Sequence, residues 1–121
     1  MICLKKYCAI ISVIYDIVYF AVPDPVEDLS LKPGSHNISV NWKQPILNSY
    51  CVTHYVIYWL HAPNGSNNSS IVSSEENSSV IKDLVACVEY EVSVRAVNEK
   101  NESKDAVTCK TTTETAGNYH A

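Results

Sequence analysis

The chain has 121 residues, of which 46% are hydrophobic and 18% charged, and its formal net charge is −4 at pH 7. This balance excludes a disordered chain and fits one globular domain. Lys5 and Lys6 form the only basic cluster. We therefore expect no nucleic-acid partner, and a membrane only if the chain is part of a larger receptor.

The first residues differ in character from the rest. Lys5 and Lys6 precede an apolar run over residues 9–21, which ends on a small residue, Ala21. This order is typical of a secretory signal peptide, and the run is well short of the ~20 residues that a spanning helix requires. We predict a signal peptide at 1–21, a domain at 22–114 and a disordered tail at 115–121. A signal anchor and a wrongly assigned start of the chain are the alternatives for the first segment.

Six asparagines fit the acceptor pattern for N-glycosylation, Asn-x-Ser/Thr. Most of them fall where we expect loops, which supports a secreted, extracellular glycoprotein. A low-complexity Asn/Ser loop is the alternative for the group between residues 64 and 70. The six candidates are Asn37, Asn64, Asn67, Asn68, Asn77 and Asn101.

Short alternating segments follow one another from residue 26 to residue 112. The clearest is 90–98, where Tyr90, Val92 and Val94 alternate with polar residues, as in a strand with one solvated face. No convincing helical period interrupts the series. The pattern predicts an all-β fold, a seven-stranded antiparallel immunoglobulin-like sandwich. The expected strands are 26–32, 38–43, 52–60, 71–73, 79–84, 90–98 and 106–112, with a turn-rich loop at 62–68.

The alternation also predicts the core. Trp42 is its expected centre, and Val80 is expected to point inward. Leu84 stands six residues before Tyr90, the spacing of a tyrosine corner, in which the chain crosses between sheets above the tyrosine. The expected core residues are Trp42, Tyr55, Ile57, Trp59, Leu84, Tyr90, Val92 and Val94.

The segment from 25 to 112 resembles a fibronectin type III domain. The matching features are the proline-led Pro25-Val26-Glu27-Asp28-Leu29, Ile38-Ser39-Val40-Asn41-Trp42 followed by Pro45, Tyr55-Val56-Ile57-Tyr58-Trp59, the spacing of Leu84 and Tyr90, and the strand at 90–98. An immunoglobulin domain would instead carry a cysteine on the 38–43 strand. The resemblance implies extracellular recognition or adhesion of proteins and no catalysis.

Three cysteines remain beyond the predicted signal peptide, an odd number for an oxidising compartment. Cys51 and Cys87 should lie at opposite ends of the sandwich, too far apart for a disulfide. We expect no disulfide within the domain, with Cys109 as a small core residue and Cys51 or Cys87 available for an intermolecular bridge. Three buried free thiols are an equally good alternative.

The ionisable residues form no recognisable catalytic or metal-binding pattern. Four histidines are scattered over separate segments, and the chain lacks both a Cys-x-x-Cys spacing and a glycine-rich phosphate loop. We therefore predict no catalytic residue, no metal ligand, no cofactor and no small-molecule substrate.

The strand at 52–60 is apolar on both sides, which is the anomaly in the pattern. If Tyr55, Ile57 and Trp59 point inward, their neighbours face outward beside charged residues of the 90–98 strand, as in a contact patch. The alternative is that long side chains of the neighbouring strand cover them. The candidate partner face comprises Val56, Tyr58, Leu60, Glu91 and Arg95.

Three functions remain open at this stage. The first is a secreted, glycosylated module for protein–protein recognition or adhesion. The second is a truncated ectodomain fragment of a multi-module membrane receptor, for example a receptor tyrosine phosphatase. The third is a matrix component cross-linked through the odd cysteine.

Overall fold

The computed structural model describes residues 9–12, 17–20, 24–46, 52–61, 65, 67–98 and 106–115, with side chains from residue 24 onward. These residues contain nine strands and no helix. All strand pairs are antiparallel. The strands are β1 (Ala9–Ser12), β2 (Ile17–Phe20), β3 (Glu27–Pro33), β4 (Ile38–Lys43), β5 (His54–His61), β6 (Asn67–Ser73), β7 (Ser78–Ile81), β8 (Glu89–Val97) and β9 (Val107–Thr112).

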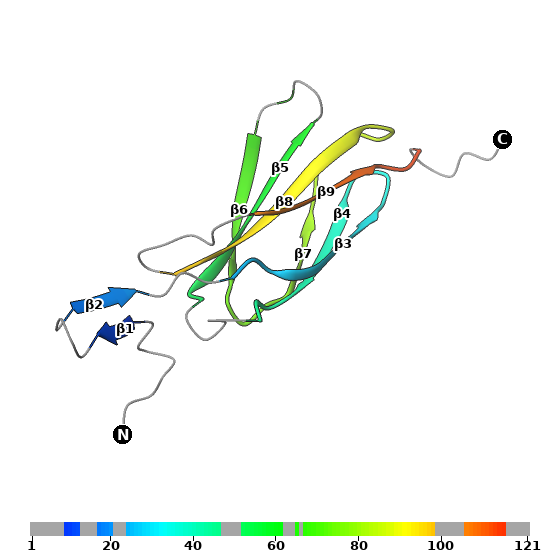
Figure 1. Cartoon of the computed structure of the whole chain (residues 1–121). Coiled ribbons are helices and arrows are strands. Elements are labelled where there is room, and N and C mark those ends of the chain that lie inside the picture. Colours follow the sequence, from blue (N-terminus) through cyan, green and yellow to red (C-terminus); the bar gives the residue numbers. More distant parts are fainter. Residues whose placement is uncertain are drawn as a thin grey trace.

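Seven of these strands build a two-layer sandwich. One sheet has the order β3-β4-β7 and the other the order β6-β5-β8-β9 (Figure 1). The clearest strands, β4 and β8, bury alternate side chains, so the inner faces of the two sheets are removed from water when the sheets pack together. The predicted seven-stranded antiparallel sandwich is confirmed.

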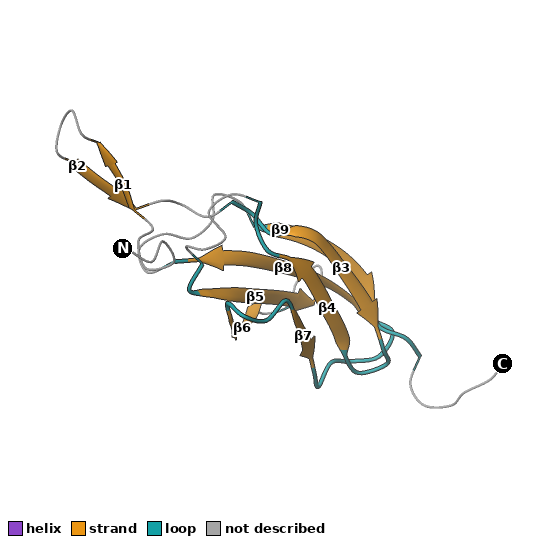
Figure 2. Ribbon diagram, turned by 90° about the horizontal axis from the view of Figure 1, so that it is seen from below, coloured by secondary structure: helices purple, strands orange, loops and turns teal. Residues whose placement is uncertain are grey.

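The two remaining strands, β1 and β2, form a hairpin of their own. Ala9 pairs with Phe20 and Ser12 with Ile17, and neither strand joins a sheet of the sandwich. Figure 2 shows the hairpin apart from the two layers. It falls within the predicted signal peptide, which stays a prediction. None of the described residues lies in a helix long and apolar enough to cross a membrane.

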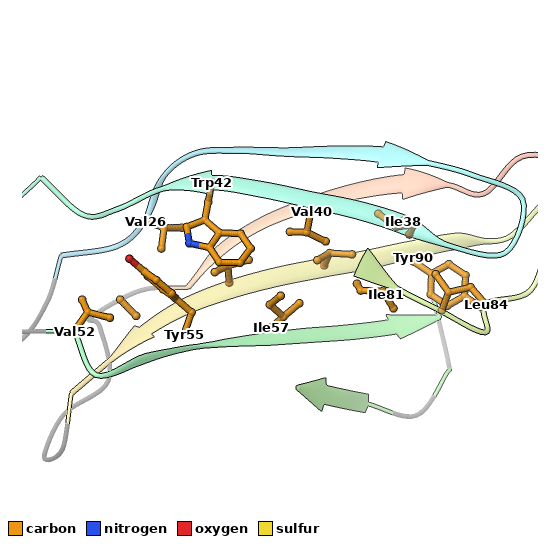
Figure 3. Close-up of a cluster of buried hydrophobic side chains, with 13 residues drawn as sticks. Val26, Ile38, Val40, Trp42, Val52, Tyr55, Ile57, Ile81, Leu84 and Tyr90 are labelled. Atoms are coloured by element: carbon orange, nitrogen blue, oxygen red, sulfur yellow. The ribbon is translucent and has the colours of Figure 1, made fainter. Parts of the chain in front are cut away.

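The core lies between the two sheets (Figure 3). Trp42 of β4 meets Tyr55 of β5 across the layers with ring centroids 5.3 Å apart and an interplanar angle of 64°, an edge-to-face arrangement that aromatic pairs favour. Of the expected core residues, Trp59 alone is half-buried and packs against the core cluster. The others are buried: Trp42, Tyr55, Ile57, Leu84, Tyr90, Val92 and Val94.

The prediction that Val80 points inward is wrong, because its side chain is 47% exposed. Ile38 pairs with Ile81 in the β4–β7 ladder, so both point into the core and Val80 points to solvent. The strand also ends at Ile81, earlier than the predicted end at residue 84. Leu84 is still buried, but it lies on the connection that follows β7.

The predicted loop at 62–68 is wrong at its end, because β6 begins at Asn67. Seven consecutive residues of β6 pair with β5 without a register shift. Asparagine and serine have low strand propensity, but here the backbone hydrogen bonds to β5 and the cross-strand neighbours outweigh it.

One end of the sandwich is tied together by hydrogen bonds between segments distant in sequence. The Val85 N–H donates to the Tyr90 hydroxyl at 3.0 Å, which is the tyrosine corner expected from the spacing. The Leu84 N–H donates to the carbonyl of His36 at 2.9 Å, and the His36 ring nitrogen Nδ1 donates in return to the Leu84 carbonyl at 3.0 Å. These bonds join the β3–β4 turn to the β7–β8 connection.

Candidate protein-recognition face

The outer face of the four-stranded sheet is assembled from cross-strand rows that the register defines. Val56 of β5 lies between Ile71 of β6 and Arg95 of β8. In the next row Tyr58 lies between Ser69 and Ser93. In the third row Leu60 lies between Asn67 and Glu91. The register therefore brings all five predicted residues of the partner face, Val56, Tyr58, Leu60, Glu91 and Arg95, to one surface.

The exposure of this face is uneven. The five predicted residues are each half-buried, as expected for side chains that lie against one another in the middle of a sheet. Ile71, at the sheet edge, is 74% exposed and carries the apolar character of the face out to solvent. A shallow hollow of about 430 Å³ follows the face, with Tyr58, Leu60 and Arg95 among its lining residues.

Charges border the apolar centre on the β8 side. Glu91 stands opposite Lys110 of β9, an opposite-charge cross-strand pair, and Arg95 stands opposite Val56. The hydroxyls of Ser93 and Thr108 are 2.8 Å apart in the row between them. The face thus offers an aromatic and aliphatic centre with a charged and hydroxylated border, the composition of a protein contact patch rather than of a reaction centre.

Ile71 is the residue of this face that sequence reasoning missed. Its strand was predicted, but the direction of its side chain was not, because a three-residue segment shows too little alternation. The pairing of Val56 with Ile71 places it on the outer face. The longer segment Ser69-Ser70-Ile71-Val72-Ser73 places Ile71 and Val72 side by side among serines, so its sequence holds no alternation that could assign the side of Ile71.

The predicted acceptor asparagines occupy different parts of the sandwich. Asn37 and Asn77 are exposed beside β4 and β7, in the loops where they were expected. Asn67 and Asn68 are exposed but lie on the edge strand β6 rather than in a loop. Asn64 and Asn101 lie outside the described residues. Glycosylation at each position stays a prediction.

The two described cysteines beyond residue 23 are unbonded thiols. Cys87 is exposed on the β7–β8 connection, and Cys109 is half-buried, opposite Val92 in the β8–β9 ladder. The Cys109 thiol lies 3.8 Å from the carbonyl of Leu29 on β3, so it packs where the edges of the two sheets approach each other. Cys51 lies outside the described residues. Cys87 is exposed, and an intermolecular bridge through it stays a prediction.

Metal binding has no visible site within the described ranges, where no three His, Cys, Asp or Glu side chains are grouped so that they could hold an ion. The outer face of the four-stranded sheet carries two acids on β8, Glu89 and Glu91, beside the basic Arg95 and Lys110 and hydroxyl, amide and apolar groups.

A two-sheet antiparallel sandwich with strand orders β3-β4-β7 and β6-β5-β8-β9 and a tyrosine corner defines an immunoglobulin-like module. The family model described as "Fibronectin type III domain" matches residues 24–109. The chain belongs to the fibronectin type III family. Members of this family are generally structural or binding modules of extracellular and receptor proteins.

Solved structures agree on the fold. A chicken tenascin segment of two fibronectin type III domains has a TM-score of 0.72 and 20% identity, covering 80% of this chain and 54% of its own length. The domain of human collagen alpha-1(XX) has a TM-score of 0.71 and 24% identity, covering 82% and 92%. The domain of human contactin 1 has a TM-score of 0.69 and 22% identity, covering 79% and 82%.

These identities show similarity of fold alone. Among curated proteins, no sequence matches the chain. The chain spans about half of the tenascin segment, so the activities and partners of such larger proteins bear on this chain only as proposals.

Proposed function

We propose that the chain is a secreted, N-glycosylated fibronectin type III module that recognises an extracellular protein through the outer face of its four-stranded sheet and performs no catalysis. The observation that carries the proposal is the apolar surface formed by Ile71, Val56, Tyr58 and Leu60 on β5 and β6, beside the charged residues of β8. Because Ile71 is 74% exposed, binding can remove more of its apolar surface from water than that of any half-buried neighbour.

Several features support export. The apolar run at 9–21 follows two lysines, and four exposed asparagines carry the glycosylation pattern. The family membership agrees, since such modules occur in extracellular and cell-surface proteins. Membership in a larger receptor ectodomain is compatible with the same face, which would then contact either a separate protein or a neighbouring module.

The experiment compares two glutamate substitutions on opposite outer faces. A dimeric fusion of the chain, collected from the medium of eukaryotic cells so that export is scored in the same preparation, is titrated on cell surfaces. Ile71→Glu places a charge on the proposed face, whereas Val80→Glu places the same charge at an exposed valine of the other sheet. We expect Ile71→Glu to weaken binding at least tenfold and Val80→Glu to leave it unchanged.

Protease treatment of the cells adds a second readout, since binding to a protein partner should disappear after it. Equal binding of the two variants would contradict the assignment of the face. Binding that survives protease treatment would contradict a protein partner.

A further inference from the structure

The four exposed sequon asparagines that the structure describes differ in what lies next to them. Asn68 is the direct cross-strand partner of Trp59, so the two residues share the inner face of the four-stranded sheet at its end. Asn67, one residue earlier, pairs with Leu60 on the outer face. The register therefore places the two neighbouring acceptors on opposite faces of β6, while Asn68 at the strand edge also borders the outer hollow.

Trp59 is the tryptophan that the core leaves partly open. Trp42 is 2% exposed, whereas Trp59 is half-buried at the margin of the core cluster. Asn77 also lies beside a tryptophan, since its backbone carbonyl accepts the backbone N–H of Trp42 at 3.0 Å, but the side chain of Trp42 is buried. Among the described sequons, the combination of an exposed asparagine and an accessible indole occurs at Asn68.

A hollow of about 370 Å³ lies between Asn68 and the β7–β8 connection. This volume is at the lower end of the range for small-ligand sites. Its lining combines the aromatic rings of Trp59 and Tyr90 with polar side chains, which matches a pyranose ring, with its apolar C–H faces and hydroxyl edges. The lining residues are Trp59, His61, Gly65, Asn68, Lys82, Asp83, Leu84 and Tyr90.

We propose that Asn68 carries an N-linked glycan whose first sugar folds back into this hollow and stacks on Trp59, as a structural part of the domain. The inference deepens the proposed function and rests on its export step. The sugar would cover apolar indole surface that the second sheet leaves open, because β7 ends at Ile81 and the chain continues there as the irregular segment that includes Lys82 and Asp83.

The sequence offers a matched pair of variants, because the two sequons overlap and each depends on a different serine. The Asn67 sequon ends at Ser69 and the Asn68 sequon ends at Ser70. Ser69→Ala therefore removes the first sequon and keeps the second, whereas Ser70→Ala removes the second and keeps the first. Each change deletes one hydroxyl from the same strand. Ser69→Ala thus keeps the acceptor on the inner face of β6 and Ser70→Ala keeps the acceptor on the outer face, with little other difference between the two variants.

The full chain is expressed in eukaryotic cells that make oligomannose glycans, and glycopeptide mass spectrometry gives the occupancy of each site. One sample is trimmed to a single N-acetylglucosamine and another is fully deglycosylated. We expect wild type and Ser69→Ala to keep their Tm after trimming and to lose about 4 °C or more after full removal. Ser70→Ala should show no such loss, because its glycan lies elsewhere.

Acrylamide quenching of tryptophan fluorescence reports the stacking directly. Since Trp42 is buried, the accessible quenching comes from Trp59 and should rise on full deglycosylation of wild type and Ser69→Ala but not of Ser70→Ala. Equal Tm and quenching in the two variants would overturn the proposal. If Asn68 carries no glycan while Asn37 or Asn77 does, the glycan proposal is overturned but export is not. If no sequon carries a glycan, both the glycan proposal and the proposed export of a glycoprotein are overturned.

Discussion

The hydroxyl of Tyr90 accepts the N–H of Val85 at 3.0 Å, on the connection that crosses from the three-stranded to the four-stranded sheet. Tyr90→Phe keeps the ring and its packing against Leu84 but leaves that part-buried N–H without its acceptor. We expect a loss of about 1–3 kcal/mol in the free energy of unfolding, measured by urea denaturation. Ser93→Ala, which removes an exposed hydroxyl contact with Thr108, should cost less than about 0.5 kcal/mol. Equal effects would mean that the corner bond contributes nothing specific.

Single-residue patterns predicted this corner, because Leu84 and Tyr90 have a characteristic spacing. They did not predict Thr113, which is 3% exposed. Its hydroxyl accepts the Val88 N–H at 3.0 Å and donates to the Val85 carbonyl at 2.6 Å, so it closes the same connection from the other side. A threonine after a β-branched strand has no sequence feature that distinguishes this role, since its partners lie 25 and 28 residues away.

At the scale of the strand, β7 tests which of two adjacent apolar residues faces the core. Ile81 is 3% exposed and Val80 is 47% exposed. We expect Ile81→Ala to lower the free energy of unfolding by about 2–5 kcal/mol through lost burial and the cavity left behind. Val80→Ala should change it by less than about 0.5 kcal/mol. The reverse order in urea denaturation would show that the strand is shifted by one residue.

The errors at this scale share a physical cause. Ser79-Val80-Ile81 places two apolar residues side by side, so alternation alone cannot choose between them, and the pairing of Ile38 with Ile81 decides. The start of β6 was also missed because pairing with a distant strand, rather than the local pattern, determines it. Its asparagines and serines carry a loop signal, and only the long ladder with β5 makes them a strand. Strands with a regular alternation of apolar and polar residues, such as β8, could be predicted from the sequence.

For the whole molecule, the fold was predictable because seven alternating segments with turn signals between them leave few arrangements other than a sandwich. The candidate face was predicted on β5 and β8, and the register brings those residues together. Its extension to Ile71 depends on which strand lies beside β5 at the edge, a nonlocal fact. The sequence pattern of a strand predicts which side chains share a face, while the order of strands in the sheet determines which of these side chains become neighbours.

The stability of the whole domain at alkaline pH depends on Tyr55, whose phenol lies in the core. Burial raises its pKa above the usual 10.0. The nearby indole N–H of Trp42, which has no partner at hydrogen-bond geometry among the residues that the structure describes, opposes part of the rise. The folded state thus holds the phenolic proton more tightly than the unfolded state. This contribution is complete below pH 10.0 and is lost as the pH rises from there through the folded-state pKa.

We therefore expect wild type to lose stability relative to Tyr55→Phe above about pH 10, because the unfolded phenol ionises first and draws the equilibrium toward unfolding. Urea denaturation of both proteins at about pH 7, 9 and 10.5 measures the difference in unfolding free energy. The substitution can shift stability at every pH by removing the hydroxyl, so the diagnostic quantity is the change in that difference between pH 9 and 10.5. A constant difference would show that the phenol titrates alike in both states, and thus that the space between the sheets around Trp42 and Tyr55 is open to water.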